Sequence, residues 1–217
     1  MCGRIDAHDP IGVNNLISIF DIVLPGGRFP PRYNIAPGAK LATVCYEHEF
    51  TIAEMTWGLL PPWAKADMRP LINARAETVR EKPAFRKLIR QTRTIVPVNG
   101  FYEWRRNGAE KRSYYFSSVD ENALALAAIY QHGSDGEPRC CIVTTAANGI
   151  MAPVHDRMPV ILAREAMSDW LRSDDDAVID ALMRPCADAS LQVMEVSAYV
   201  NNARNEGERC ITPVHAG

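Results

Sequence analysis

The sequence lacks the features that mark membrane-spanning, secreted and repetitive proteins. No apolar run approaches the roughly 20 residues that a membrane helix needs, and the opening MCGRID has neither the basic region nor the apolar stretch of a signal peptide. The 217 residues also contain no internal repeat and no shift in composition that would indicate an interdomain linker. We therefore expect a cytoplasmic protein with a single domain over residues 1–217 and no contact with a membrane.

Cysteine is too sparse and too irregularly spaced to indicate a disulfide framework or a metal centre. The chain has six cysteines, and none belongs to a C-x-x-C pair of the kind that binds zinc. Cys140 and Cys141 are adjacent, so in a strand their side chains would point to opposite faces and would not easily share one tetrahedral metal ion. We expect no metal and no other cofactor.

The chain as a whole has no basic excess that would indicate a nucleic-acid partner, since its formal net charge is −2. The two halves nevertheless differ. Residues 1–115 hold 17 Lys and Arg against 11 Asp and Glu, a net charge of +6, whereas residues 116–217 hold 7 against 15, a net charge of −8. Phosphates respond to local potential, so the first half can supply a basic face on an acidic body. An ordinary solvated surface is the alternative.

The composition that is present, with 47% hydrophobic residues, indicates a globular protein. Apolar patterns and turn signals predict strands at 41–46, 51–57, 94–98, 100–105, 112–118, 123–130, 139–145 and 191–197. Helices are expected at 9–20, 77–90, 164–172 and 174–184, with Asp9 capping the first and Ser173 the last. Strands in runs with inserted helices favour an α+β fold, in which a largely antiparallel, barrel-like β core carries peripheral helices.

Two proline-rich segments, 24–38 and 60–70, predict extended and stiff loops. The second displays Trp63 near its tip. Exposed tryptophan is uncommon, and an aromatic ring at a loop tip can stack on a nucleic-acid base. Trp63 is therefore a candidate binding residue.

Cys2 is the most unusual position for chemistry. If Met1 is removed, the chain begins with an amine and a thiol on adjacent carbons. Their reference pKa values, about 7.7–8.0 for the amine and about 8.5 for the thiol, make both available as nucleophiles near neutral pH. Such a pair condenses with an aldehyde to an imine and then closes to a five-membered thiazolidine. The alternative is an incidental, buried cysteine near a terminus.

Two further titratable residues lie in unusual surroundings. Glu103 belongs to an aromatic strand, GFYEWR, where burial would keep a carboxyl protonated as a general acid. A two-residue turn at Asn107 and Gly108 would instead place Glu103 opposite Arg112 as an ion pair. His155 lies in the loop PVHDRMP, where it is either a positioned proton shuttle or a surface histidine.

Asparagines beside arginines form the last group of candidates. Asn73 lies in PLINARAE near Arg75, and Asn34 lies in RYNIAPG near Arg32. An amide orients oxygens without titrating, so it can hold a sugar hydroxyl while an arginine binds a phosphate. Asparagines that form turns beside solvated arginines are the alternative.

Taken together, these segments resemble one family. MCGR at the start, RYNIAPG, the pair Trp57-Gly58, LINARAET, GFYEW, VTTAAN and VHDRMPVIL are similar to the motifs of the SRAP family, the SOS-response-associated peptidases or abasic-site processing proteins. The match is ordered and runs from residue 1 to about residue 200. Composition and periodicity alone do not lead to this function.

The resemblance implies a sensor of abasic sites in single-stranded DNA that takes part in the response to DNA damage. Cys2, freed by a peptidase-like removal of Met1, would bond to the ring-opened sugar and shield the lesion. Asn73 would position the sugar, Glu103 would act as general acid and base, and His155 would move protons. Strand incision by β-elimination from the imine, a lyase activity, is a further implication.

The resemblance also implies DNA-binding residues and a location. Arg4, Arg75 and Arg157 would hold backbone phosphates, Asn34 would help to order the pocket, and Trp63 would stack near the lesion. Ala64 follows Trp63 where some relatives carry another aromatic residue, which would weaken stacking here. The protein would act as a monomer that associates with the nucleoid when bound to DNA.

Two functions from other classes stay open. An N-terminal-nucleophile hydrolase would use Cys2 and Glu103 on amide substrates in trans. A non-catalytic single-strand binder would need only the arginines and Trp63. Capture of abasic DNA that depends on Cys2 separates both from the leading hypothesis.

Overall fold

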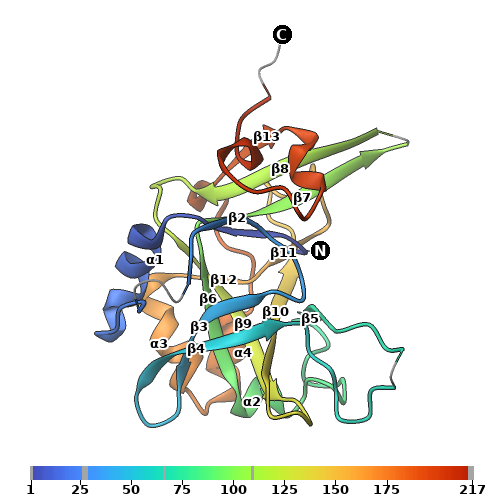
Figure 1. Ribbon diagram of the computed structural model, residues 1–217. Helices are drawn as coiled ribbons and strands as arrows, with labels where there is room; N and C mark the ends of the chain where they lie inside the picture. Colours follow the sequence, from blue (N-terminus) through green and yellow to red (C-terminus); the bar gives the residue numbers. More distant parts are fainter. Residues whose placement is uncertain (1, 26–28, 66, 109, 215–217) are drawn as a thin grey trace.

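Two β-sheets form the centre of the molecule (Figure 1). The computed structural model describes residues 2–25, 29–65, 67–108 and 110–214. The first sheet has the strand order β13 (Leu191–Val196), β8 (Glu110–Ser118), β7 (Gly100–Asn107), β1 (Ile5–Ala7) and β2 (Arg32–Ile35). The second has the order β11 (Arg157–Pro159), β10 (Pro138–Ala146), β4 (Phe50–Trp57), β3 (Lys40–Tyr46), β6 (Arg93–Val98), β9 (Leu124–His132) and β12 (Ile161–Leu162), and β5 (Asn73–Arg75) also pairs with β10.

The second sheet closes into a ring because β9 also pairs with β10. The closure is not that of a true barrel. Strand β10 shares only two residue pairs with β4, Arg139 with Thr56 and Cys140 with Trp57, and these strands run parallel. Most other pairings are antiparallel. The expected α+β fold with a largely antiparallel β core is therefore confirmed, as a ring of strands.

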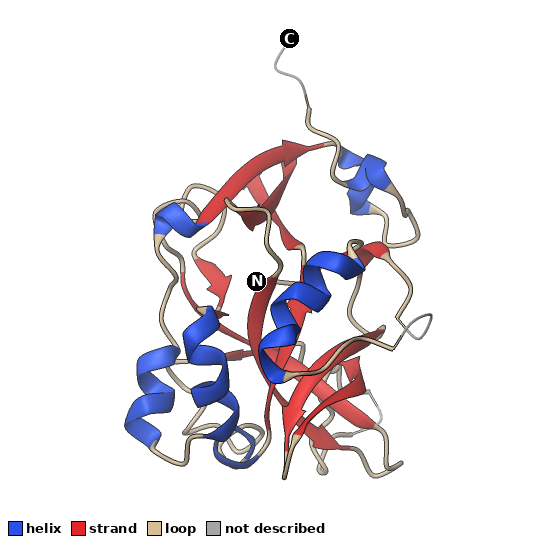
Figure 2. Ribbon diagram, turned by 90° about the vertical axis from the view of Figure 1, so that its left-hand side faces the viewer, coloured by secondary structure: helices blue, strands red, loops and turns tan. Residues whose placement is uncertain are grey.

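Short helices lie at the periphery, as expected (Figure 2). They are α1 (Pro10–Ile17), α2 (Leu88–Gln91), α3 (Met167–Arg172) and α4 (Asp176–Leu182). Asp9 caps α1 by accepting hydrogen bonds from the backbone N–H groups of Ile11 and Gly12, which confirms that prediction. No helix among the described residues is long and apolar enough to cross a membrane.

The predicted helix at 77–90 is wrong over most of its length. Thr78 accepts hydrogen bonds from the N–H groups of both Glu81 and Lys82, and the chain then turns until α2 begins at Leu88. Pro83 has no N–H to continue a helical ladder beyond this point. The result is a turn-rich segment that leads from β5 to α2.

Two smaller predictions also need correction. Asp175, rather than Ser173, caps α4 by accepting from the N–H of Ala177, while Ser173 ends α3. The proline-rich segment 24–38 is not a loop throughout, because Arg32–Ile35 forms β2 on the edge of the first sheet. These residues follow Pro31 and contain no proline themselves, so their N–H groups are free to pair.

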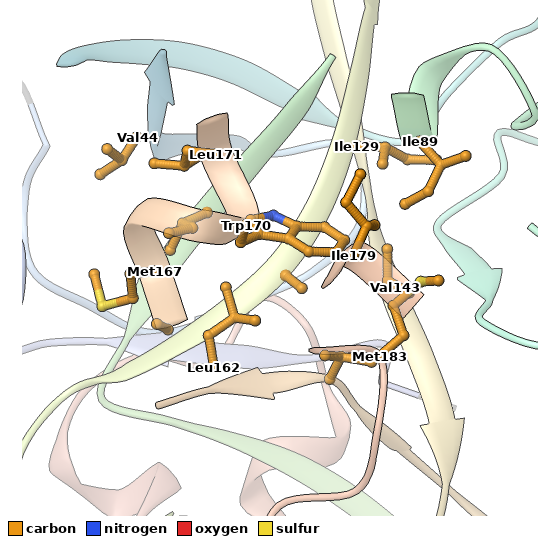
Figure 3. Packing of buried hydrophobic residues seen from close by; sticks show 14 of the residues in the cluster. Val44, Ile89, Ile129, Val143, Leu162, Met167, Trp170, Leu171, Ile179 and Met183 are labelled. Atoms are coloured by element: carbon orange, nitrogen blue, oxygen red, sulfur yellow. The ribbon is translucent and has the colours of Figure 1, made fainter. Parts of the chain in front are cut away.

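Each face of the strand ring packs against a separate apolar cluster. Trp170 of α3 lies in the cluster under the helices (Figure 3). Its indole Nε1 donates to the Thr94 carbonyl at 3.0 Å. The second cluster joins the ring to the first sheet and includes Val96 of β6 and Phe101 of β7. Cys2 belongs to this second cluster, so the packing of the two sheets fixes the start of the described chain.

Candidate active site

Cys2 is buried against the first sheet. Its exposed fraction is 0%. Burial raises the pKa of the Cys2 thiol well above its usual range, the negative charge of Glu103 raises it further, and the backbone N–H of Arg4 opposes the shift. The thiol is therefore held in its protonated form at neutral pH. Met1, whose removal the sequence analysis expects, lies outside the described residues.

Asn73 holds the backbone of Cys2. It lies on β5, a three-residue strand that pairs with β10 in register Asn73 to Ile142. The Asn73 side-chain Nδ2 donates to the Cys2 carbonyl at 2.9 Å. Its Oδ1 is buried and has no hydrogen-bond partner among the described residues. A buried acceptor without a donor costs about 1–3 kcal/mol, so this oxygen is suited to a ligand that brings a hydroxyl.

Glu103 is buried beside Cys2, with 3% of its surface exposed. The N–H of Trp104 donates to its Oε2 at 3.3 Å. Its effect on the pKa of the Cys2 thiol shows that the two side chains are electrostatic neighbours. A carboxyl group in this position is able to exchange protons with a group that reacts at Cys2.

The alternative for Glu103, an ion pair with Arg112 across the hairpin, is wrong. Strand β7 ends at Asn107, which pairs with Glu110, so the register places Glu103 opposite Tyr114 and Arg112 opposite Arg105. The turn lies one residue later than the sequence suggested, which moves the partner of every residue by two positions.

His155 lies in the loop between β10 and β11. Its side chain is 27% exposed. The backbone N–H of Arg157 donates to His155 Nδ1 at 3.0 Å, and an Asp156 carboxylate oxygen lies 2.9 Å from the same nitrogen. In the neutral ring that accepts from Arg157, the proton is on Nε2. The proposed role in proton transfer stays a prediction.

Arg157 is held by an ion pair. Its NH1 and NH2 groups donate to the two Glu77 carboxylate oxygens at 2.7 and 2.9 Å, and NH2 also donates to the Thr144 carbonyl at 2.6 Å. This pairing lowers the pKa of Glu77. A phosphate that binds Arg157 must compete with Glu77, so the predicted phosphate contact remains to be tested.

Arg4 and Asn34 bind each other and the C-terminal part of the chain. Arg4 NH1 donates to Asn34 Oδ1 at 2.6 Å and to the Val200 carbonyl at 2.8 Å. Asn34 is fully buried, and its Nδ2 donates to the carbonyls of Asn202 and Asn205 at 3.0 and 2.8 Å. Asn34 therefore orders the surroundings of Arg4, while contact of Asn34 with DNA stays a prediction.

Trp63, Asn73 and Arg75 line one open groove of about 770 Å³. Trp63 is 56% exposed at the tip of its loop, and Arg75 is also exposed. The isolated bridge between Leu59 and Leu71 closes the base of the Trp63 loop. The structure thus brings an aromatic ring, a cation and the amide that holds Cys2 to one surface.

The sequence of this chain matches the model of the family described as SOS response associated peptidase (SRAP) over residues 1–203. The chain belongs to the SRAP family. It is 35% identical to the abasic site processing protein YoqW of Bacillus subtilis, over 97% of this chain and 99% of that protein. It is 32% identical to the abasic site processing protein YedK of Escherichia coli, over 84% of this chain and 85% of that protein.

Solved structures support the SRAP fold. A crystal structure of a protein from Bacteroides thetaiotaomicron superimposes with a TM-score of 0.81 at 24% identity, covering 99% of this chain and all of that one. A phage-related protein from Bordetella bronchiseptica has a TM-score of 0.73 at 26% identity, over 90% of this chain and 94% of that one.

Sequence reasoning on this SRAP chain missed two sets of residues. Lys82 and Phe85 line the groove with Trp63, and they come from the segment wrongly predicted as a helix. The carbonyls that bind Asn34 come from residues 166 to 171 positions away in the sequence, and no local pattern signals such contacts. The Trp104 ring lies near the Arg4 guanidinium, and its place directly after the GFYE motif is the sequence signal for this contact.

Proposed function

We propose that this protein processes abasic sites in single-stranded DNA by bonding covalently to the opened sugar through Cys2. The observation that carries the proposal is the Asn73 side chain, which donates to the Cys2 carbonyl and has a buried Oδ1 without a described partner. In the proposal, this oxygen accepts a hydrogen bond from a sugar hydroxyl next to Cys2. The names of the relatives YoqW and YedK support abasic DNA as the target.

The reaction begins with removal of Met1, because the nitrogen of Cys2 is an amide and not a nucleophile while Met1 is attached. Water is consumed and free methionine is released. The new amine then adds to the C1′ aldehyde of the opened sugar, and the resulting carbinolamine loses one water to form an imine. Holding the aldehyde beside the amine raises its effective concentration.

In the proposed sequence the carbon–nitrogen bond forms before the carbon–sulfur bond. Burial, which raises the pKa of the Cys2 thiol, agrees with this order. Sulfur then adds to the imine carbon while the thiol proton is transferred to the nitrogen, and the thiazolidine ring closes. Glu103 is the buried acid–base group beside Cys2 and relays these protons. Ring closure removes the imine from which β-elimination would cut the strand.

Intact mass spectrometry tests the proposal. The processed protein mixed with a single-stranded oligonucleotide that contains one abasic site is expected to gain the mass of the oligonucleotide minus one water, in a heat-resistant adduct. Cys2→Ala should abolish that adduct. Cys186→Ala is the matched control, because Cys186 is the cysteine in the described chain that is not fully buried, and it should leave the adduct unchanged.

A variant with serine separates the two bonds. Cys2→Ser keeps the amine but cannot close the sulfur ring, so it should form an imine that is trapped by borohydride and lost on heating. A heat-resistant adduct of Cys2→Ala in wild-type yield would contradict the assignment of Cys2. Peptide hydrolysis in trans without any response to abasic DNA would favour an N-terminal-nucleophile hydrolase instead.

A further inference from the structure

The two faces of the β7–β8 hairpin differ in how their charges are neutralised. On one face, Arg112 donates to Glu110 at 2.6 Å and lies 3.5 Å from Glu195, and the Arg105 guanidinium lies 5.4 Å from the Tyr114 ring centroid. Arg112 on this face therefore has two acidic partners, whereas Arg105 contacts an aromatic ring. The hairpin projects beyond the first sheet (Figure 1).

The opposite face carries cations that no acidic group of the described chain neutralises. Register places Arg106 opposite Lys111 and Trp104 opposite Ser113, so these four side chains share one face. Neither Arg106 nor Lys111 forms an ion pair with a described residue. Burial and the positive charges of Arg106 and Arg4 lower the pKa of Lys111, which shows that the cations repel one another.

Trp104 connects these cations to the candidate active site. The Lys111 ammonium lies 4.7 Å from the Trp104 ring centroid, and the Arg4 guanidinium lies 5.8 Å from it. The indole Nε1 donates to Asn201 Oδ1, which fixes the plane of the ring. Arg4 is two residues from Cys2, and its carbonyl accepts from the N–H of Tyr102 at 3.0 Å. The cationic face therefore includes Arg4, a predicted phosphate-binding residue, whereas Glu103, the buried neighbour of Cys2, projects from the other face of β7.

The two cations lie close together at the outer end of the face. Residues directly opposite each other on paired strands have Cβ atoms about 4.5–5.5 Å apart, so Arg106 and Lys111 present two neighbouring positive charges to a nucleic-acid backbone. On the other side of Cys2 lies the groove of Trp63 and Arg75, reached through the contact of Asn73 with Cys2. Figure 1 shows β5, the start of the chain and the hairpin in succession along one side of the molecule.

We propose that Arg106 and Lys111 bind backbone phosphates of single-stranded DNA on one side of the captured sugar, with Trp104 positioning the Lys111 ammonium. This inference rests on the proposed function for the identity of the ligand. It extends the binding surface beyond Arg4, Arg75, Arg157 and Trp63 to the outer face of the hairpin. Charge complementarity and continuity with Arg4, a predicted phosphate-binding residue, favour DNA over a protein partner.

Fluorescence anisotropy with a lesion-free, single-stranded oligonucleotide tests this surface separately from the covalent chemistry. Each lost phosphate contact should reduce the slope of log K against log salt by about 0.7, so Arg106→Gln combined with Lys111→Gln should reduce it by about 1.4. The affinity at 0.1 M salt should fall by roughly tenfold or more. Lys111→Arg keeps the charge and should retain the slope.

Arg112→Gln is the matched control, because it removes one positive charge from the neutralised face of the same hairpin. It should leave the salt slope at the wild-type value. A wild-type slope in the Arg106→Gln/Lys111→Gln double variant, or an equal loss in Arg112→Gln, would overturn the assignment. Thermal unfolding should be the same for all three proteins, since these side chains are exposed.

Strands shortened from either end locate the contact. The advantage of the wild type over the double variant should disappear when nucleotides are removed on one side of the abasic site and persist when they are removed on the other. Persistence in both cases would contradict the inference. At saturating abasic DNA the double variant should still form the full adduct. A wild type that forms no adduct would refute the proposed function. The binding of lesion-free DNA would then still test whether Arg106 and Lys111 bind phosphates.

Discussion

Two asparagines on short strands, Asn34 and Asn73, differ in how fully their side chains are hydrogen-bonded. Asn34 of β2 binds Arg4 through its Oδ1 and backbone carbonyls of the C-terminal segment through its Nδ2, so every polar atom of its side chain has a partner. Asn73 of β5 binds the Cys2 carbonyl with Nδ2, but its Oδ1 has no described partner. The first amide is fully hydrogen-bonded within the protein, whereas the second has an oxygen without a described partner.

The difference extends to the surroundings of each residue. On the neighbouring strand β1, Asp6 accepts from Tyr115 at 2.6 Å and lies 2.8 Å from the His8 ring nitrogen, whereas the buried Nε of Arg4 has no partner among the described residues. Around Asn73 the chain leaves an open groove with Trp63 and Arg75. Fully bonded polar clusters rigidify a fold, whereas buried groups with unused capacity concentrate at binding sites. Substitution of Asn73 should therefore mainly lower the reaction rate, and substitution of Asn34 should mainly lower the free energy of unfolding.

Asn73→Ala should show the largest effect on the reaction. We expect the rate of adduct formation to fall by about 100-fold to 1000-fold, as when one positioned hydrogen-bonding group is removed from a catalytic site. The free energy of unfolding should change by less than about 1 kcal/mol, because one modest hydrogen bond is lost and one unsatisfied acceptor is removed. Single-turnover kinetics with abasic DNA and chemical denaturation measure the two quantities.

Asn73→Asp separates the two ends of this amide. It keeps an oxygen acceptor for the sugar but loses the donor to the Cys2 carbonyl, so its rate should lie between those of the wild type and Asn73→Ala. Wild-type kinetics in Asn73→Ala would remove this residue from the site and leave its buried oxygen without an explanation.

Asn34→Ala should have the opposite profile. It removes the acceptor for Arg4 and the donor for the carbonyls of Asn202 and Asn205, so the free energy of unfolding should fall by about 2–4 kcal/mol. Calorimetry measures the loss. Below its lowered melting temperature, the protein should still form the covalent adduct at a rate within about tenfold of the wild type. A larger kinetic defect in a fully folded variant would place Asn34 in the DNA-binding machinery.

The contrast between the asparagines also shows how far sequence reasoning reaches. Both residues were identifiable as candidates, since each lies beside an arginine in a short motif. Their difference was not identifiable, because the carbonyls that bind Asn34 come from the far end of the chain and the strand that carries Asn73 is placed by pairing with β10. Local patterns predict residue types at a site, and long-range packing decides which atoms are satisfied.

The strands show the same limit. Alternation predicted the β7–β8 hairpin, but a turn one residue later replaced the expected partner of Glu103, Arg112, by Tyr114. That shift removes the alternative of an ion pair with Arg112 and leaves Glu103 as a buried carboxyl beside Cys2. Pro83 likewise could have been taken as a helix breaker, and the turn-rich segment around it supplies Phe85 to the groove.

Glu77→Gln tests whether the ion pair between Glu77 and Arg157 competes with DNA for Arg157. Glu77 occupies Arg157 and places a negative charge where the proposed phosphate would lie. We expect the affinity for single-stranded DNA to rise by roughly threefold to tenfold, with a loss of stability below about 1 kcal/mol because the Glu77 side chain is half exposed. Anisotropy at two salt concentrations measures the gain.

Glu81→Gln is the control for this gain, because it removes the same charge from an exposed position in the neighbouring segment without releasing Arg157. An equal rise in both variants would indicate a general effect of net charge. An unchanged or weaker affinity in Glu77→Gln would assign Arg157 a structural role only.

A substitution of His8 should produce the smallest effect, and the effect should be limited to stability. The hydrogen bond to Asp6 raises the pKa of His8 above its usual value, against the opposing effect of burial. A raised pKa in the folded state means that the pair stabilises the protein fully below the unfolded value of about 6.5, and that this contribution is lost as the pH rises through the folded-state pKa. His8→Gln should therefore flatten the pH dependence of the free energy of unfolding above pH 6.5, by less than about 1 kcal/mol, as followed by melting temperatures. The rate of adduct formation at a fixed pH should stay at the wild-type value. A slower reaction in His8→Gln would show that the His8–Asp6 pair is coupled to the candidate active site.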